Sequence, residues 1–371
     1  MKRMVSILLV AALMLCLCAC GQTDKAPDSA KENTTSATDT TSTTEGETTT
    51  TTVEDSTTGT TTTAADTSAT TTTTGGNKTT AESKNTTTAS QWGNWEPPVP
   101  PQTTAEATEG TTKPQPKKSI RILAVGNSFS VDAMQLHLYW MLEAAGYNDI
   151  VLGNLYIGGC SLDIHYNNIK NGKAAYEFRV TTDGFWETKP NVKADVAFSY
   201  ADWDVVTLQQ ASPDSGRPDS YANLTALAQM VQEKAKPKKL LWHMTWAYQQ
   251  NSDHWAFAQY GKDQMTMYNA IVDTMTDKVL SNSLIDGIIP CGTAVQNLRT
   301  SKLGDTLTAD GYHLSDRIGD YVASLTWFAV ITGNAPAEVG YCPGYVDDYF
   351  DDMAASVENA IKKPTAVTPC K

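Results

Sequence analysis

Residues 119–130 read Ser-Ile-Arg-Ile-Leu-Ala-Val-Gly-Asn-Ser-Phe-Ser, and this stretch decides the fold. Apolar residues dominate 119–125 without the alternation of a half-exposed strand, which predicts a strand buried on both faces. The strand ends at Gly126. Residues 132–145 then carry apolar side chains at helical spacing, and Gly146 follows as a stop. A buried strand followed directly by a helix is the first unit of an α/β sheet.

The alternation of strand and helix continues along the chain. It predicts a three-layer α/β/α sandwich around a mostly parallel, five-stranded sheet. In such sheets ligands bind beyond the carboxyl ends of the strands, so catalytic residues are expected just after each strand. The further predicted strands are 150–157, 203–208, 240–245 and 285–289, the further helices are 221–234, 257–279 and 315–332, and residues 174–186 are a candidate hairpin.

The composition divides the chain into a tether and one domain. Residues 20–117 are dominated by Thr and have almost no aliphatic side chains, so they cannot bury enough apolar surface to offset the entropy of ordering. We expect a disordered linker there, followed by one domain over 118–371. The chain has 371 residues and a formal net charge of −13. This charge argues against nucleic acid as a partner, since a phosphate-binding surface needs clustered Lys and Arg.

The first residues are typical of an export signal. Residues 1–19 begin with basic side chains and continue in an apolar run that is shorter than a membrane span. The segment Leu17-Cys18-Ala19-Cys20-Gly21 resembles a bacterial lipobox. That resemblance implies that Cys20 is lipidated and anchors the protein to the extracellular face of the cell membrane. An ordinary cleaved signal that happens to contain cysteines is the alternative.

Four cysteines lie in the expected exported domain, where disulfides are permitted. We expect Cys342 to pair with Cys370, which would fasten the C-terminal tail. The spacings do not resemble a zinc site, and no metal or organic cofactor is implied.

Two motifs carry candidate catalytic side chains. Ser128 follows the first strand on a turn into a helix, which exposes its hydroxyl close to helix N-terminal amides. Asp310-Gly311-Tyr312-His313 precedes the last predicted helix. A serine nucleophile needs a base, and the base needs a partner that orients its other ring nitrogen. Since Asp310 and His313 are three residues apart, they can meet around a single turn.

The order of these motifs resembles the SGNH, or GDSL-like, hydrolase superfamily over roughly residues 120–332. The resemblance implies a flavodoxin-like arrangement, with Ser128 as nucleophile and Asp310 and His313 as its partners. It also implies that the Gly159 amide, or the Gly158 amide if the register is shifted by one, points at an oxyanion.

One departure from that family concerns the oxyanion. The family usually has an Asn after its third strand, whereas here Gln209 and Gln210 follow Leu208. A Gln amide has the same two N–H donors on a longer stem, so either Gln could substitute. The alternative is a site with only the Ser128 and Gly159 amides, and losing one donor can cost about 10²–10³ in rate. A bacterial subgroup of unassigned function is similar in its G-N-S-F-S, L-Q-Q and D-G-x-H-L segments.

Four further residues are candidates for contact with substrate. Asn127 stands where the family usually has Asp; it can support the turn through backbone hydrogen bonds. His243 and Trp246 follow the fourth strand, where aromatic rings suit stacking on sugars. His165 follows the oxyanion loop. The alternative is that His243 is a buried core residue and that His165 has no role.

These features predict an extracytoplasmic serine ester hydrolase that removes acetyl or other acyl groups from carbohydrate. An O-acyltransferase needs the same triad but must exclude water. A non-catalytic glycan-binding or adhesion module on the same fold is the alternative from another class, because a fold does not determine a function. A solute-binding lipoprotein is disfavoured by the single domain.

Overall fold

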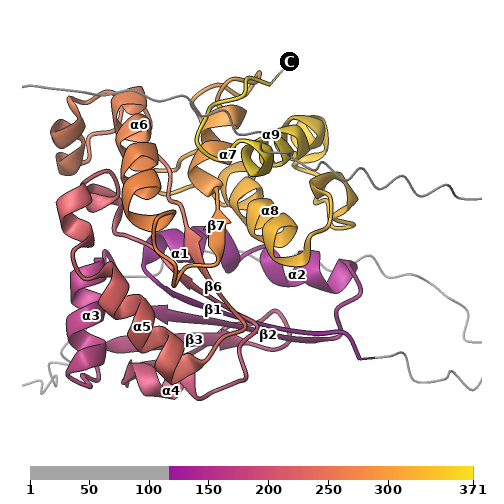
Figure 1. Cartoon of the computed structure of the whole chain (residues 1–371). Helices are drawn as coiled ribbons and strands as arrows, with labels where there is room; N and C mark the ends of the chain where they lie inside the picture. The colour runs from indigo at the N-terminus through magenta and orange to yellow at the C-terminus, as the bar shows by residue number, and fades with distance from the viewer. Residues whose placement is uncertain (1–116, 371) are drawn as a thin grey trace, which may run out of the picture. The chain divides into compact units, whose positions relative to one another are not determined.

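The computed structural model describes residues 117–370. They form an α/β fold around one seven-stranded sheet with the order β4-β3-β2-β1-β5-β6-β7 (Figure 1). The α/β class and the mostly parallel sheet are confirmed. The predicted count of five strands is wrong, because a hairpin adds two antiparallel strands beyond β2. The strands are β1 (Ser119–Gly126), β2 (Asp149–Tyr156), β3 (Tyr176–Thr181), β4 (Glu187–Val192), β5 (Val205–Leu208), β6 (Lys239–His243) and β7 (Gly287–Ile289).

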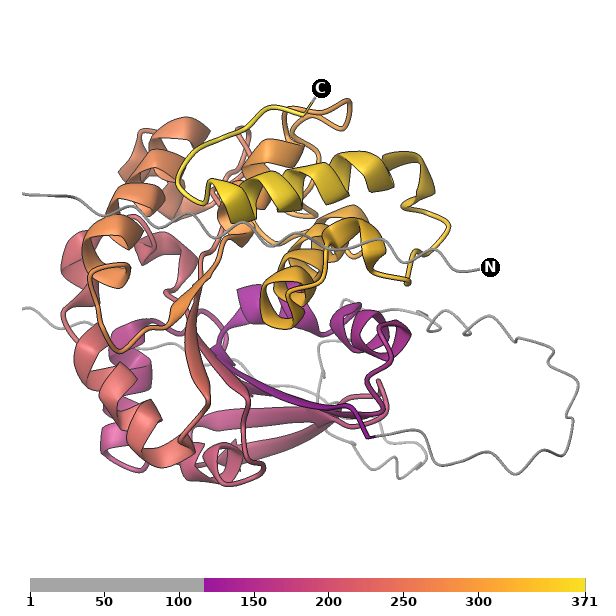
Figure 2. The same cartoon turned by 45° about the vertical axis from the view of Figure 1, so that its right-hand side comes forward.

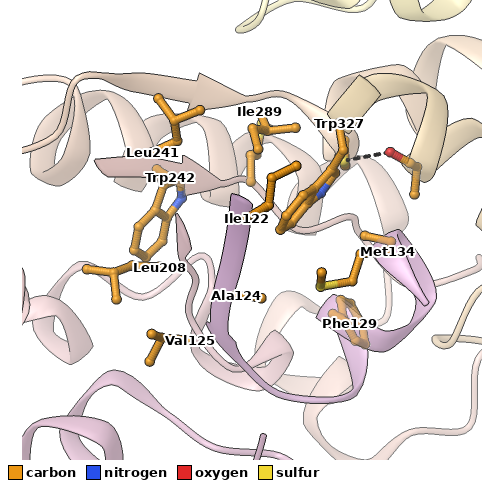
Figure 3. Close-up of a cluster of buried hydrophobic side chains, with 14 of the residues drawn as sticks. Ile122, Ala124, Val125, Phe129, Met134, Leu208, Leu241, Trp242, Ile289 and Trp327 are labelled. Atoms are coloured by element: carbon orange, nitrogen blue, oxygen red, sulfur yellow. Dashed lines mark hydrogen bonds between the residues drawn. The ribbon is translucent and has the colours of Figure 1, made fainter. Parts of the chain in front are cut away.

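The first predicted strand lies between β2 and β5 and pairs in parallel with both. Its side chains point alternately to the two faces, and both faces are covered (Figure 3). Ile122 and Ala124 lie toward Trp327, whereas Val125 lies toward Leu208. The five apolar side chains of β1 are all buried, which accounts for the apolar run in the sequence: Ile120, Ile122, Leu123, Ala124 and Val125.

Helices cover both faces of the sheet. Figures 1 and 2 show α1, α2, α7, α8 and α9 on one side and α3, α4 and α5 on the other. Contacts of α8 with α1, α2 and α7 join the first group. The helices are α1 (Ser128–Met134), α2 (Leu138–Ala144), α3 (Leu162–Lys170), α4 (Ala194–Phe198), α5 (Leu224–Ala235), α6 (Gln264–Thr274), α7 (Cys291–Leu298), α8 (Ile318–Thr332) and α9 (Phe350–Lys362).

Two long predicted helices are interrupted. The helix expected over 132–145 starts earlier and breaks between α1 and α2, where the Trp186 indole N–H donates to the Gln135 carbonyl. The helix expected over 257–279 is a 3-10 turn, η3 (Trp255–Tyr260), then α6 and a π-helical turn. Gly261, in the left-handed region at φ 67°, ends η3, and Asp263 caps α6.

The expected disulfide is absent from the described residues. The thiols of Cys342 and Cys370 are both free: Cys342 contacts Asp347, and Cys370 lies against the Asn297 carbonyl. None of the helices within 117–370 is long and apolar enough to cross a membrane. The expected signal over 1–19, the expected tether over 20–117 apart from its last residue, and the expected Cys20 anchor lie outside the described residues.

Candidate active site

The serine motif forms the turn between β1 and α1. Asn127 caps α1 by accepting a hydrogen bond from the Phe129 N–H at 3.0 Å, and Ser128 is the first helical residue. Gly126 has no room for a side chain, because a Cβ there would lie 2.5 Å from Ser130 Oγ and 2.9 Å from Gln209 Oε1. The turn is therefore fixed from beneath, and the Ser128 hydroxyl is left partly exposed.

The structure brings the three expected catalytic side chains together. Ser128 Oγ lies 2.8 Å from His313 Nε2, and His313 Nδ1 lies 2.8 Å from Asp310 Oδ2. The other carboxylate oxygen of Asp310 accepts hydrogen bonds from the Tyr312 and His313 amides. Because a carboxylate only accepts, this network assigns the ring proton to Nδ1 and leaves Nε2 free to take the serine proton.

Three hydrogen bonds, two from the loop after β6 and one from α1, fix the loop that carries Asp310 and His313. The Trp246 indole N–H donates to the Tyr312 carbonyl at 2.8 Å, and the backbone N–H of Gln249 donates to the Gly311 carbonyl at 2.8 Å. From the opposite side, Asp132 Oδ2 accepts the Leu314 N–H at 2.9 Å. Sequence reasoning missed Asp132 and Gln249. The only signal for Asp132 was its position four residues after Ser128, on the same face of a helix.

A buried chain of polar groups lies under the nucleophile turn. Gln209 donates through Nε2 to Asn127 Oδ1 at 2.7 Å, and its Oε1 lies 3.0 Å from His243 Nδ1. Asn127 in turn donates to the Cys160 carbonyl at 3.0 Å. These contacts tie the ends of β1, β5 and β6 to the loop after β2. Asn127 thus supports the turn and, being buried, has no surface for substrate.

Gln210 is not placed to stabilise an oxyanion. Its Oε1 accepts hydrogen bonds from the Leu162 and Ala211 amides, and its Nε2 donates to the carbonyl and the hydroxyl of Ser220. Both N–H groups are therefore used in fixing the start of α3 to the loop before α5. Gln210 therefore has a structural role, and its amide is not free to take the donor role that the resemblance implied.

Two backbone amides remain as candidate oxyanion donors. Ser128 is the first residue of α1, where an amide has no acceptor within the helix. Gly159 is exposed after β2, has a φ of 61°, and its amide makes no hydrogen bond within residues 117–370. A positive φ at this position favours glycine over every side-chain-bearing residue. A site whose oxyanion donors are the Ser128 and Gly159 amides alone stays a prediction.

Three expected substrate contacts are buried instead. His243, Trp246 and His165 each have 0% exposure. The His165 ring lies 3.2 Å from the Tyr176 hydroxyl, and burial lowers the pKa of both histidines to about 3, so both are neutral. Trp246 stacks on Phe129 with ring centroids 4.3 Å apart. These side chains shape the core beneath the site and do not face substrate.

A pocket of about 230 Å³ opens beside Ser128 and His313. One wall comes from β2 and β3, where the Arg179 guanidinium lies 3.8 Å from the Tyr156 ring centroid and pairs with Glu177 at 2.7 Å. The pocket therefore presents both donors and acceptors next to the nucleophile. Its lining residues are Ser128, Val131, Asp132, Tyr156, Arg179, Ala309, His313, Leu314 and Asp316.

The pKa values of the carboxyl groups around the site are shifted in opposite directions. Burial would raise the pKa of Asp310, but hydrogen bonds from the His313 ring and from two amides bring it below its ordinary value. In contrast, burial raises the pKa of Asp132 and Asp320 well above the ordinary value, and repulsion by neighbouring carboxylates adds to the effect. Asp310 is thus ionised at neutral pH, whereas Asp132 and Asp320 hold their protons to a higher pH than an ordinary carboxyl group does.

This difference predicts the pH dependence of stability. A carboxyl with a raised pKa in the folded protein favours folding at low pH, and that contribution is lost as pH rises above about 4 toward the folded pKa. The slope is at most about 1.4 kcal/mol per pH unit for each proton. We expect Asp320→Asn to reduce this loss between pH 4 and 8, measured by urea unfolding. Parallel curves for the two proteins would contradict the assignment. The Asp310 contribution is lost separately, below about pH 4.

None of the described residues form a group of three or more His, Cys, Asp or Glu side chains suited to a metal ion.

Comparison with known proteins identifies the family. Residues 121–360 match the family described as a domain of unknown function (DUF4886), and the chain belongs to it. A crystal structure of a DUF4886 family protein from Bacteroides uniformis is 40% identical, covering 68% of this chain and 98% of its own, with a TM-score of 0.65. No curated protein matches the chain.

Two further solved structures have lower sequence identity to this chain and lower TM-scores. A protein from Slackia heliotrinireducens described as a candidate SGNH hydrolase is 20% identical, covering 57% of this chain and 98% of its own, with a TM-score of 0.36. An acetyl xylan esterase is 19% identical, covering 57% of this chain and 100% of its own, with a TM-score of 0.35.

Proposed function

We propose that this chain is an extracytoplasmic serine ester hydrolase that removes acetyl or other small acyl groups from carbohydrate. The observation that carries the proposal is the hydrogen-bonded series Ser128, His313 and Asp310, with two distances of 2.8 Å. Neither a capping role for Ser128 nor a surface role for His313 requires this alignment, since Asn127 already caps the helix. Alignment of nucleophile, base and orienting carboxylate is what acyl transfer needs.

The proposed reaction proceeds in two halves. Ser128 Oγ forms a bond to the ester carbonyl carbon while its proton passes to His313 Nε2, and the oxyanion accepts from the Ser128 and Gly159 amides. The carbon–oxygen bond to the alcohol then breaks, and His313 returns the proton to the leaving oxygen. Water attacks the acyl-enzyme in the same way, which releases the acid and restores Ser128.

The pocket supports a small acyl group and a polar alcohol. Arg179 and Tyr156 offer donors, and Asp316 offers an acceptor, so hydroxyl groups of a sugar would be matched there. Because Ser128 is partly exposed, water can reach the acyl-enzyme, which favours hydrolysis over transfer to another alcohol. The expected location outside the cytoplasm, anchored through Cys20, rests on the N-terminal sequence.

The test, with the full chain, is release of acetate from acetylated xylan and of p-nitrophenol from p-nitrophenyl esters whose acyl chains have two to twelve carbons. We expect turnover of the acetyl ester, and a decline as the acyl chain grows beyond the pocket. Absence of turnover with every ester would contradict the proposal. A preference for long chains would contradict the small-acyl assignment.

A further inference from the structure

The most exposed of the large hydrophobic side chains in residues 117–370 lies near the catalytic loop. Trp255, the first residue of η3, is 73% exposed. An indole in water is unfavourable unless it has a partner, and a single such ring is not unusual on a protein surface. What distinguishes Trp255 is its connection, through a series of rings, to the catalytic histidine.

Four rings follow one another from the surface to the site. Trp255 stacks on His254 with centroids 5.7 Å apart and an interplanar angle of 29°. His254 meets the edge of Tyr312 at 4.6 Å, and Tyr312 lies 4.2 Å from His313. The three rings before His313 form what we call the aromatic track: Trp255, His254 and Tyr312. Its inner end therefore lies beside the base that would act on Ser128.

The track is rigid for a surface feature. The His254 ring accepts the Ala256 N–H at 3.2 Å and so caps η3. Below it, the buried Tyr248 ring contacts His254 at 4.8 Å and Tyr312 at 5.8 Å. The preceding Ser252 packs so closely on Gly311 that a Cβ there would lie 2.9 Å from Ser252 Oγ. The segment carrying Trp255 is thus docked on the catalytic loop and does not need to order when a ligand arrives.

The charge around the track selects the ligand class. Burial lowers the pKa of His254 below its ordinary value, and this effect outweighs the nearby Asp310 and Asp253 carboxylates, which act in the opposite direction, so its ring is neutral at neutral pH. The charged groups closest in sequence are Asp253 and Asp310, both acidic, and no Lys or Arg interrupts residues 248–261. Anionic ligands are disfavoured here. Neutral rings with carboxylate acceptors suit a neutral ligand that has both apolar C–H faces and hydroxyl groups.

We propose that the aromatic track is a binding subsite for the polysaccharide chain that carries the ester. The inference rests on the proposed function, because it places the sugar next to the carbon that Ser128 would attack. It also replaces the expected role of Trp246, whose ring is buried, with a different tryptophan nine residues further along the chain. The sugar chain stacks on Trp255 while its acyl group enters the pocket beside Ser128.

The first test compares Trp255→Ala with Phe185→Ala in the full chain. Phe185 is a matched control, because it is 58% exposed and contacts Trp140 at the turn of the β3–β4 hairpin instead of the catalytic loop. We expect Trp255→Ala to raise KM for acetylated xylan about five- to tenfold and to leave kcat/KM for p-nitrophenyl acetate within twofold. Trp255→Phe should recover most of the loss. Phe185→Ala should change neither the KM for acetylated xylan nor kcat/KM for p-nitrophenyl acetate.

Two results would overturn the subsite. An unchanged KM for acetylated xylan would show that the polymer does not use Trp255. An equal loss on p-nitrophenyl acetate would show that Trp255 only supports the catalytic loop. A selective loss on p-nitrophenyl octanoate would equally contradict it, because the track would then bind an acyl chain.

A second measurement separates the subsite from the chemistry. Electrophoresis through a gel containing acetylated xylan reports binding without turnover. We expect the gel to retard Ser128→Ala and to retard Ser128→Ala/Trp255→Ala less. If the wild-type protein hydrolyses no ester but this difference is observed, the subsite is supported and the proposed hydrolase is not. If esters are hydrolysed but the difference is absent, the subsite fails alone.

Discussion

Replacing Ser128 with alanine is expected to lower kcat for p-nitrophenyl acetate by about 10⁴- to 10⁶-fold, the range over which removal of a triad member acts. Ser128 is the only hydroxyl bonded to His313 Nε2, so no other side chain among the described residues is placed to take its role. Because the hydroxyl caps nothing and is partly exposed, the free energy of unfolding should change by no more than about 0.5 kcal/mol.

The matched control for this variant is Ser130→Ala. Ser130 lies on the same helix, but its hydroxyl donates to the Asn127 carbonyl at 2.7 Å, and its Oγ lies 3.1 Å from Asn154 Oδ1, away from His313. We expect this variant to lose about 1 kcal/mol of stability and to retain turnover. Comparable turnover by Ser128→Ala and wild type, or a larger loss in Ser130→Ala, would remove Ser128 from the mechanism.

Of the substitutions proposed here, Trp246→Ala is expected to lower the free energy of unfolding most. The ring is fully buried, stacks on Phe129 and donates to the Tyr312 carbonyl. Truncating a buried Trp costs about 3–5 kcal/mol, which is a large share of the stability of a domain. Turnover of the remaining folded protein should also fall, because the loop that carries His313 loses one of its three attachments.

Trp246→Phe separates packing from the hydrogen bond. Phenylalanine preserves most of the contact with Phe129 but leaves the Tyr312 carbonyl without its donor, at a cost of about 1–3 kcal/mol. Urea unfolding and kcat measured on the same samples report both effects. Wild-type stability in Trp246→Ala would mean that this tryptophan does not support the catalytic loop.

The parallel strands and the candidate catalytic residues could be predicted for two different reasons. A strand covered on both faces must be apolar throughout, so 119–125 was recognisable without its neighbours. A serine directly after the first strand and an Asp-x-x-His motif before the last predicted helix are more specific together than either is alone. Ser128, Asp310 and His313 could therefore be proposed from their order in the chain. The hairpin was harder: every residue of β4 from Glu187 to Asn191 is exposed, so its sequence lacks the apolar pattern of the parallel strands.

The supporting residues were not predictable because their roles depend on pairings distant in sequence. Gln210 and Gln209 look equivalent in the chain, yet one bonds to Ser220 and the other to Asn127. Trp246 and Trp255 both follow β6, and only the packing shows which is buried and which is exposed. Sequence patterns report the environment of a whole element well and the direction of one loop side chain poorly.

The most direct test of the central claim is labelling of the full chain with a fluorophosphonate, followed by mass spectrometry of the peptides. In this reaction the activated serine oxygen bonds to phosphorus and fluoride leaves. The account predicts one phosphonylated residue, Ser128, with labelling slowed at least 100-fold in His313→Ala, since the hydroxyl then lacks its base. Labelling at another residue, or at the same rate without His313, would contradict the account.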